Sequence, residues 1–294
     1  MSDTTQFISS PTSDAVDAVY RGMDREALTK AYDNSGAVSD SPAWLQRWRE
    51  RSEVLRAKPG HPLDIAYGSG ERQKIDYFTC GIPHAPLFVF LHGGYWQRNS
   101  RDMFSFVAEG PMASGFDVAV VGYTLAPQAG LQQILDECSW ALDFLFDRAD
   151  ALTLRFDPRN VIVGGWSAGG HLAATLLTGE HRIKGALSIS GIFDLEPIAL
   201  CALNDKLGLS SEEAMRLSPL HRIAPSQPAL YAVYGEDELD ELQRQSIDYA
   251  RAALAAGAHV RIESIAGCNH FSILDELYRT DGRLVRCLQT LSGL

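Results

Sequence analysis

The segment GWSAG (165–169) carries the residue type best suited to nucleophilic chemistry, a serine between two glycines. It follows the apolar stretch NVIVGG (160–165) and precedes an apolar helical stretch (172–177). In a strand–turn–helix of this kind the serine stands on a strained turn, its neighbours two residues away on each side must be small, and its oxygen lies at the positive end of the helix. The pattern predicts Ser167 as the nucleophile of an acyl transfer, with a serine that only caps the helix as the alternative.

A second glycine-rich segment, HGGYW (92–96), follows the apolar stretch PLFVFL (86–91) directly. Glycines after a strand let backbone N–H groups face a cavity, because no Cβ stands in the way. In lipases and esterases such a loop and the residue after the nucleophile stabilise the oxyanion of the tetrahedral intermediate. The expected donors are the N–H groups of Gly94, Tyr95 and Ala168, with Gly93 as a rival. An ordinary Gly-Gly turn is the alternative.

The candidate general base is His270, in the loop GCNHF (267–271) just past the last apolar stretch, HVRIES (259–264). A histidine in this loop can reach back over the edge of the sheet toward Ser167. A histidine side chain ordinarily has a pKa of about 6.5, so an imidazole can accept and return a proton near neutral pH. The position also agrees with the chain order Ser, then Asp or Glu, then His that accompanies G-x-S-x-G.

The acid of such a triad is expected at the carboxyl end of a strand between Ser167 and His270. The stretch ALYAVY (229–234) is followed by GEDELD (235–240), which holds four carboxylates. The competing residues are Glu236, Asp237, Glu238 and Asp240. The residue pattern alone does not choose among them, and at least three must be surface charges.

The other histidines are expected to be structural. His92 is expected to brace the glycine loop by hydrogen bonding, and His171, one helical turn after Ser167, to pack near the serine turn. The remaining five are expected to be surface or core residues: His61, His84, His181, His221 and His259.

Elements that can position these residues follow from the hydrophobic pattern. Short continuous apolar runs suit strands buried on both faces of a parallel sheet. The runs are 86–91, 117–122, 160–165, 184–190, 229–234 and 259–264, and the alternating segments 63–67 and 74–79 predict a hairpin. Helices are expected over 132–146, 172–177, 239–256 and 271–278. Alternation of strands and helices is the signature of an α/β fold, a mostly parallel central sheet with helices on both faces.

The chain is expected to form one main domain with two appendages. Residues 1–60 form a polar leader with a helix that has Ser41 as N-cap and Pro42 at its first position. The domain proper covers 61–294. The stretch from about 195 to 227, with a short helix over Ser210 to Leu217, is interpreted as a lid-like insertion over the carboxyl edge of the sheet, where ligands bind in such folds.

Composition narrows the partners. The chain has 294 residues, of which 46% are hydrophobic, and a net charge of −11, so it is globular and repels nucleic acid and anionic lipid. The polar start is no signal peptide and no apolar run approaches the length of a membrane span. The five cysteines are scattered, which favours reduced thiols in the cytoplasm. We expect a small-molecule substrate, no metal and no cofactor. The sequence does not decide whether the protein forms a homodimer.

Several motifs together resemble the kynurenine formamidase (arylformamidase) family of α/β-hydrolases. They are HGGYWQ (92–97), GYTLAP (122–127), GWSAGGHLAA (165–174), SGIFDLEPI (190–198), SPL (218–220), the pair Gln245-Ser246 and NHF (269–271). The likeness covers about 63 to 290, and AYDNS (31–35) in the leader is similar as well. The resemblance implies an α/β-hydrolase fold. HGGxW is far more specific than G-x-S-x-G.

The resemblance also selects one acid. The family's acid lies three residues after the glycine that ends its strand and seven before the Gln of the Gln-Ser pair, and both anchors give Glu238. Animal members carry Asp there, so Glu is a departure that remains chemically competent. Asp237 is kept as the rival.

The activity implied by the resemblance is hydrolysis of N-formyl-L-kynurenine to L-kynurenine and formate, in tryptophan breakdown. Trp96, Trp166 and Phe193 are expected to build an apolar substrate pocket, and Arg98 or Arg101 to meet a substrate carboxylate. The same residues would serve a short-chain carboxylesterase or another amidase. A non-catalytic binding protein on the same scaffold is the remaining alternative.

Overall fold

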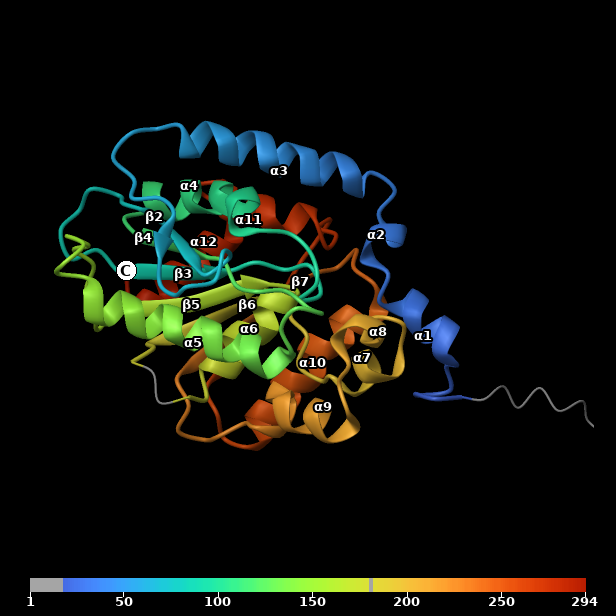
Figure 1. Cartoon of the computed structure of the whole chain (residues 1–294). Helices are drawn as coiled ribbons and strands as arrows, with labels where there is room; N and C mark the ends of the chain where they lie inside the picture. The colour runs from blue at the N-terminus through green and yellow to red at the C-terminus, as the bar shows by residue number, and fades with distance from the viewer. Residues whose placement is uncertain (1–17, 180–181) are drawn as a thin grey trace, which may run out of the picture.

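The computed structural model describes residues 18–179 and 182–294, so the start of the predicted leader (1–17) and His181 lie outside the described residues. Within these ranges eight strands form one sheet in the order β1-β2-β4-β3-β5-β6-β7-β8 (Figure 1). The strands are β1 (Ile65–Ala66), β2 (Lys74–Phe78), β3 (Leu87–Leu91), β4 (Asp117–Val121), β5 (Val161–Trp166), β6 (Gly185–Ile189), β7 (Ala229–Gly235) and β8 (Val260–Ile265). β2 pairs antiparallel with β1 and β4, and every other pair is parallel. The predicted hairpin and the mostly parallel α/β sheet are both confirmed.

Helices cover both faces of the sheet (Figure 1). They are α1 (Arg25–Ala31), α2 (Asn34–Ala37), α3 (Ser41–Arg56), α4 (Glu109–Ala113), α5 (Leu131–Arg148), α6 (Ala168–Leu176), α7 (Glu196–Leu200), α8 (Asn204–Leu207), α9 (Ser211–Leu217), α10 (Asp240–Ala255), α11 (Asp275–Tyr278) and α12 (Arg283–Ser292). Three 3-10 helices are η1 (Arg101–Ala108), η2 (Pro219–His221) and η3 (Ser272–Leu274). No helix of the described ranges combines the length and the apolar character needed to cross a bilayer.

The continuous apolar pattern of the central strands has a simple structural cause. In β3, Leu87, Val89 and Leu91 face the core that includes α5, α6 and α10. Phe88 and Phe90 face the opposite core, with α3, η1, α11 and α12. Because successive side chains of a strand point to opposite faces, a strand covered on both sides must be apolar at every position.

Several element bounds differ from the sequence prediction by one or more residues, and two of the differences have a clear local cause. Ser41 is the first residue of α3, and Asp40 takes the N-cap position, so Pro42 still lies in the first turn, where its missing N–H costs nothing. The helix predicted over 271–278 is divided into η3 and α11. The chain begins here with the tighter 3-10 turn of η3. At its start, Ser272 Oγ accepts from the Asn269 N–H, and the Asn269 side chain accepts from the Ser272 N–H.

The described part of the leader is packed into the body of the protein. Trp48 and Leu55 of α3 are fully buried, and Trp48 stacks on Phe106 of η1 with ring centroids 5.5 Å apart. Ser52 Oγ donates to the carbonyl of Met103 over 2.8 Å. Leu28 and Tyr32 of the leader lie in the opposite core, so the leader contributes to both cores of the main domain.

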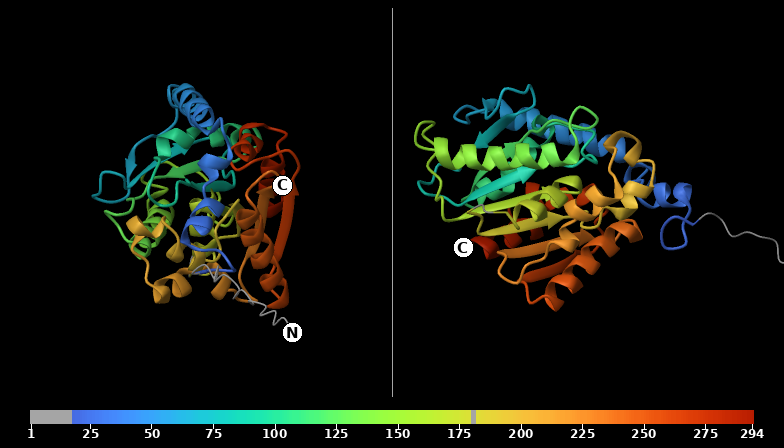
Figure 2. Two further views of the ribbon diagram at one scale, coloured as in Figure 1. Left: turned by 90° about the vertical axis from the view of Figure 1, so that its right-hand side faces the viewer. Right: turned by 60° about the horizontal axis from the view of Figure 1, so that its bottom comes forward.

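The segment predicted as a lid-like insertion forms α7, α8, α9 and η2 between β6 and β7. It lies beside α1 at the end of the molecule opposite the C-terminus (Figures 1 and 2). Arg25 forms a 2.5 Å salt bridge to Asp205, and the N–H of Ala202 donates to Thr29 Oγ1 over 3.0 Å. Leader and insertion thus meet directly.

Candidate active site

The turn between β5 and α6 holds Ser167 in a strained conformation, with φ 58° and ψ −118°. A Cβ on Gly169 would lie 1.9 Å from the carbonyl oxygen of Leu91, and a Cβ on Gly165 would lie 2.4 Å from the backbone of Gly169. Neither position can hold a larger residue without moving the backbone. The requirement for small residues on both sides of the serine is therefore met as the sequence predicts, and Ser167 precedes the first turn of a fully buried helix.

The glycine loop after β3 is equally tight. A Cβ on Gly93 would lie 2.5 Å from the ring of Trp166, and one on Gly94, whose φ is +117°, would lie 2.5 Å from the carbonyl oxygen of Arg98. Within the described ranges, the expected oxyanion donors give no hydrogen bond to other protein groups, nor does the rival Gly93. All four N–H groups are therefore unpaired there, so the assignment of Gly94, Tyr95 and Ala168 as oxyanion donors, with Gly93 as a rival, stays a prediction.

His92 supports this loop and does not lie in the pocket at Ser167. Its Nδ1 is 2.9 Å from the carbonyl oxygen of Gly93, and its ring stacks on Tyr123 with centroids 4.3 Å apart. Tyr123 in turn donates to the His92 carbonyl over 2.6 Å. Full burial lowers the pKa of His92 to about 4, so the ring is neutral at pH 7.

Glu238 and His270 are in direct contact: Glu238 Oε2 lies 2.8 Å from His270 Nδ1. The other carboxylate oxygen, Oε1, accepts from Ser190 Oγ over 2.6 Å and from the N–H of Gly235 over 2.7 Å. Three donors can therefore hold one buried carboxylate. Such a carboxylate orients an imidazole and stabilises its protonated form, which leaves Nε2 as the basic atom.

The structure brings only one of the four competing acids to the histidine. Glu238 is buried, whereas Glu236, Asp237 and Asp240 are exposed. The turn after β7 explains the difference, because the N–H of Asp237 donates to the carbonyl of Cys268 and the N–H of Glu238 to that of Gly235. This turn places the side chain of Glu238 under the histidine loop.

Ser167 and His270 line one pocket of about 70 Å³. Their side chains come from the ends of different elements, and the residues are 2% and 3% exposed. The pocket is completed by Asn34, Ser35, Leu45, Gly94, Tyr95, Arg98, Asn99, Trp166 and Phe271. A nucleophile, a base with its carboxylate and backbone N–H donors around one small pocket can carry out acyl transfer.

Only one of the three predicted pocket aromatics lines this pocket. Trp166 does so, and its Nε1 donates to the carbonyl of His270 over 2.7 Å. Trp96 is fully buried against His171, with ring centroids 5.1 Å apart. Phe193 is fully buried and stacks on Tyr249. The latter two residues are core residues, because an aromatic next to a motif fills the protein interior as readily as it lines a pocket.

A larger groove of about 310 Å³ adjoins the small pocket and shares Asn34, Ser35, Tyr95 and Arg98 with it. Its other walls come from the leader and from the insertion, the latter through Ala202, Leu203, Asp205 and Lys206. Of the two arginines proposed to meet a carboxylate, Arg98 lines both cavities. Arg101 is bound by Asp64 and Asp76 and lines neither.

The leader is tied to the glycine loop through the hydroxyl of Tyr95. This hydroxyl donates to the carbonyl of Tyr32 over 2.5 Å and accepts from Asn34 Nδ2 over 2.9 Å. Gln245 Nε2 fixes Tyr32 in turn by donating to its hydroxyl over 2.9 Å. Asn34 contacts the Tyr95 hydroxyl, and Ser190 contacts Glu238. Sequence reasoning missed both as site residues, although they lie in the motifs AYDNS and SGIFDLEPI that carried the resemblance.

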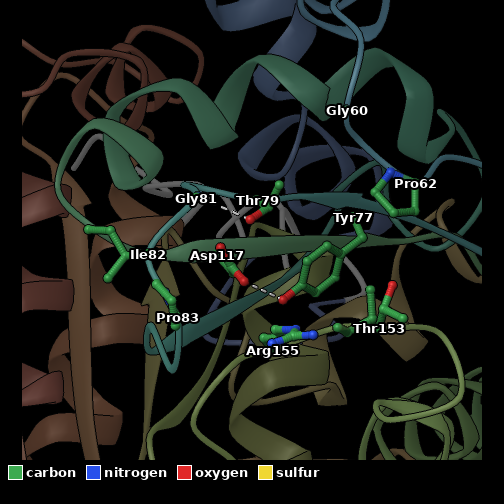
Figure 3. A pocket seen from close by; sticks show the side chains of 11 residues that line it. Gly60, Pro62, Tyr77, Thr79, Gly81, Ile82, Pro83, Asp117, Thr153 and Arg155 are labelled. Atoms are coloured by element: carbon green, nitrogen blue, oxygen red, sulfur yellow. Dashed lines mark hydrogen bonds between the residues drawn. The ribbon is translucent and has the colours of Figure 1, made fainter.

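A second cavity, of about 220 Å³, lies at the opposite edge of the sheet, where β4 begins (Figure 3). Its buried carboxylate, Asp117, accepts from the Tyr77 hydroxyl over 2.5 Å and from the Cys80 N–H over 2.8 Å. These groups satisfy one another. None of the residues predicted to do chemistry lines this cavity. Across 18–179 and 182–294, no group of three or more His, Cys, Asp or Glu side chains is arranged to hold a metal ion.

The chain is similar to several known hydrolases. The BD-FAE family model matches residues 81–211. A kynurenine formamidase from Danio rerio is 29% identical over 265 residues, which are 85% of this chain and 88% of that protein. The carboxylic ester hydrolase LipN from Mycobacterium tuberculosis is 27% identical over 71% of this chain and 62% of its own length.

Solved structures share the fold. A presumed thioesterase from Silicibacter sp. TM1040 superposes with a TM-score of 0.79 and 27% identity, covering 89% of this chain and 98% of its own. The central sheet, the serine turn and the order of the candidate residues along the chain are those of an α/β-hydrolase.

Proposed function

Because the chain belongs to the arylformamidase family of α/β-hydrolases, we propose that it hydrolyses an aryl formamide, N-formyl-L-kynurenine, through Ser167, His270 and Glu238. That it is a hydrolase of amide or ester bonds follows from its relatives. One observation carries the assignment of the residues: the 2.8 Å contact of Glu238 with His270, whose ring lines the same pocket as Ser167.

In the first half of the reaction, Ser167 Oγ attacks the formyl carbon while His270 Nε2 takes its proton. The carbonyl oxygen becomes an oxyanion, to which the N–H groups of Gly94, Tyr95 and Ala168 donate. Each such donor is worth about 3 kcal/mol of activation free energy. His270 then gives the proton to the aryl nitrogen, the C–N bond breaks, and the amine leaves a formyl ester on Ser167.

In the second half, water attacks this ester while His270 takes one of its protons. The bond between carbon and Oγ breaks, the proton returns to Ser167, and formate leaves. Glu238 keeps its charge throughout and stabilises the cationic imidazole in both halves. The net reaction consumes one water and yields one amine, one formate and one proton.

The size of the pocket at Ser167 supports a small acyl group. About 70 Å³ suits a formyl group, while the adjoining groove of about 310 Å³ has room for the larger part of the substrate. Short esters meet the same requirement, and the similarity to LipN supports a short-chain carboxylesterase as the second candidate function.

A substrate panel tests the proposal. The values of kcat/KM are compared for N-formyl-L-kynurenine, formanilide, acetanilide and p-nitrophenyl acetate, with the intact protein and with Ser167→Ala. We expect the formamides to be preferred, acetanilide to be poor, and all turnover to be lost in Ser167→Ala. Preference for the ester would support the second candidate. Undiminished turnover by Ser167→Ala, or its labelling by a fluorophosphonate, would exclude the serine mechanism.

A further inference from the structure

The side-chain amide of Asn34 has an unusual environment at the junction of the two cavities. The residue is 4% exposed and lines both the small pocket and the groove. Its Nδ2 donates to the Tyr95 hydroxyl, but its Oδ1 is buried without any hydrogen-bond partner. A buried carbonyl oxygen without a hydrogen bond lowers the stability of the folded protein. Such an oxygen in a native structure therefore points to a donor from outside the chain.

The orientation of this amide is fixed by its neighbours. The Tyr95 hydroxyl has one proton, and that proton is given to the carbonyl of Tyr32 over 2.5 Å. The hydroxyl oxygen can therefore only accept from Asn34, which requires Nδ2 on that side. Oδ1 must occupy the other position, where it can accept a hydrogen bond but cannot donate one.

A charged side chain without a protein partner among the described residues lines the same two cavities. The guanidinium of Arg98 lines both cavities, is exposed, and forms no salt bridge with any residue that the structure describes. Arg101, only three residues away, is by contrast bound to Asp64 and Asp76. Arg98 is therefore available to an external anion, and a guanidinium suits a carboxylate because it can donate two parallel hydrogen bonds.

The groove also carries charges of both signs. Asp33 lies on its leader wall, and Asp205 and Lys206 lie on its insertion wall. A neutral ester would gain nothing from this arrangement. A ligand group with one positive and one negative charge a few bonds apart would be attracted by the acidic and the basic side chains together. An α-amino acid head group, with its ammonium and carboxylate on one carbon, is such a group.

We propose that the groove binds the α-amino acid head group of the substrate, with Arg98 as partner of its carboxylate and Asn34 Oδ1 as acceptor for its ammonium group. The proposal rests on the function proposed above and assigns specificity to two residues outside the triad. The formamide then lies at Ser167, and the charged head lies in the part of the groove that borders Asn34 and Arg98. Asn34 and Arg98 then determine which formamides are hydrolysed well.

Three substrates separate the contributions. N-formyl-L-kynurenine carries both charges, 4-(2-formamidophenyl)-4-oxobutanoate lacks only the ammonium group, and 2'-formamidoacetophenone lacks the whole head. For the intact protein we expect kcat/KM to fall stepwise along this series, by about tenfold or more for each charge removed. Equal kcat/KM for all three would overturn the proposal while leaving the formamidase function intact. Failure to hydrolyse any of them would remove the proposed function, and this inference with it.

Variants assign each step to a residue. Arg98→Leu should raise KM by about tenfold or more for both carboxylates and change the value for 2'-formamidoacetophenone less than about threefold. Arg159→Leu, an exposed arginine away from both cavities, is the matched control and should change none of the three. An equal loss on all substrates in Arg98→Leu would contradict its role.

Asn34→Leu removes both the acceptor and the hydrogen bond to Tyr95, so Tyr95→Phe is measured beside it. Tyr95→Phe should slow all three substrates alike, because it removes the hydrogen bond and leaves Oδ1 in place. Asn34→Leu should in addition lower the preference for N-formyl-L-kynurenine over the oxobutanoate by about tenfold. If both variants leave that preference unchanged, Asn34 does not receive the ammonium group and the assignment is wrong.

Discussion

Ser190 Oγ donates a 2.6 Å hydrogen bond to Glu238 Oε1, the carboxylate oxygen that faces away from His270. Ser190 directly follows β6, and its φ of +51° is rare for a residue with a side chain. The strained backbone brings the hydroxyl to the carboxylate. It holds Glu238 from the side opposite the imidazole, which makes Ser190 a positioning residue.

Ser190→Ala should lower kcat by about tenfold and change KM little, because a less well held carboxylate orients His270 less well while the substrate contacts are unaltered. Steady-state kinetics with a formamide or an ester will measure this. Ser188→Ala is the matched control, since Ser188 is buried in β6, two residues before Ser190, but its Oγ has no hydrogen-bond partner. A fall in KM and kcat together, or an equal effect in the control, would contradict a positioning role.

Glu238→Gln should lower kcat by about 10³-fold or more, because an amide cannot stabilise the cationic imidazole and favours the wrong tautomer. Asp237→Asn should stay within about twofold of the intact protein, because Asp237 is exposed and does not contact His270. Circular dichroism will show that both variants fold. The reverse ranking would make Asp237 the acid.

Tyr95→Phe should lower kcat by about tenfold for every substrate. It removes the hydrogen bonds to Tyr32 and Asn34 that hold the loop whose N–H groups face the oxyanion. Tyr77→Phe serves as the control: it also deletes a buried hydroxyl, but at the opposite edge of the sheet. It should lower the free energy of unfolding and leave kcat unchanged. Equal kcat in the two variants would show that the leader does not influence the loop.

The free energy of unfolding should fall as the pH falls from about 6.5 to 4. Burial lowers the pKa of both His92 and His171 from the ordinary value of 6.5 to about 4. Between these values the unfolded chain binds protons that the folded protein does not. Stability is therefore complete above the upper value and is lost as the pH drops through this window, by about 3 kcal/mol for each histidine.

Urea unfolding at several pH values will measure this loss. His171→Gln should show a shallower dependence on pH than the intact protein, whatever its stability at pH 7, because one buried imidazole is gone. His259→Gln, at an exposed position, should keep the original slope. Identical slopes in all three proteins would mean that the buried histidine does not contribute.

Trp48→Ala should lower the free energy of unfolding by about 3 to 5 kcal/mol. The indole of Trp48 is fully buried and meets the ring of Trp166, next to the candidate nucleophile, with centroids 5.2 Å apart. Trp140→Ala removes an indole that is 52% exposed and should cost little. Comparable losses in the two variants would show that the leader does not stabilise the domain.

The sheet could be predicted from the sequence, and residue patterns alone singled out two of the three triad candidates, whose roles stay predictions. Ser167 and His270 could be predicted because strand, turn and helix patterns surround one and a late loop holds the other. Glu238 required the family resemblance, since four carboxylates follow the same strand and only the turn geometry buries one of them.

The pocket could not be predicted from the sequence. An apolar aromatic such as Trp96 has the same sequence pattern whether it fills a core or lines a cavity, and the structure places it in the core. Asn34 could not be predicted as a site residue, because its role depends on a contact between the leader and a loop far along the chain. Its free carbonyl oxygen becomes visible only when the partner of Nδ2 is known.

The walls of the outer groove come from two short segments, 29–35 and 202–206, neither of which is part of the sheet, and from Tyr95, Gln97 and Arg98 of the glycine loop. Substitutions at other positions of these segments can therefore change which leaving groups are accepted, whereas Tyr32 and Asn34 also hold Tyr95 of the glycine loop. Directed evolution toward new formamides would best randomise both segments together with Tyr32 and Asn34 kept, since each segment forms only part of the surface that a substrate meets.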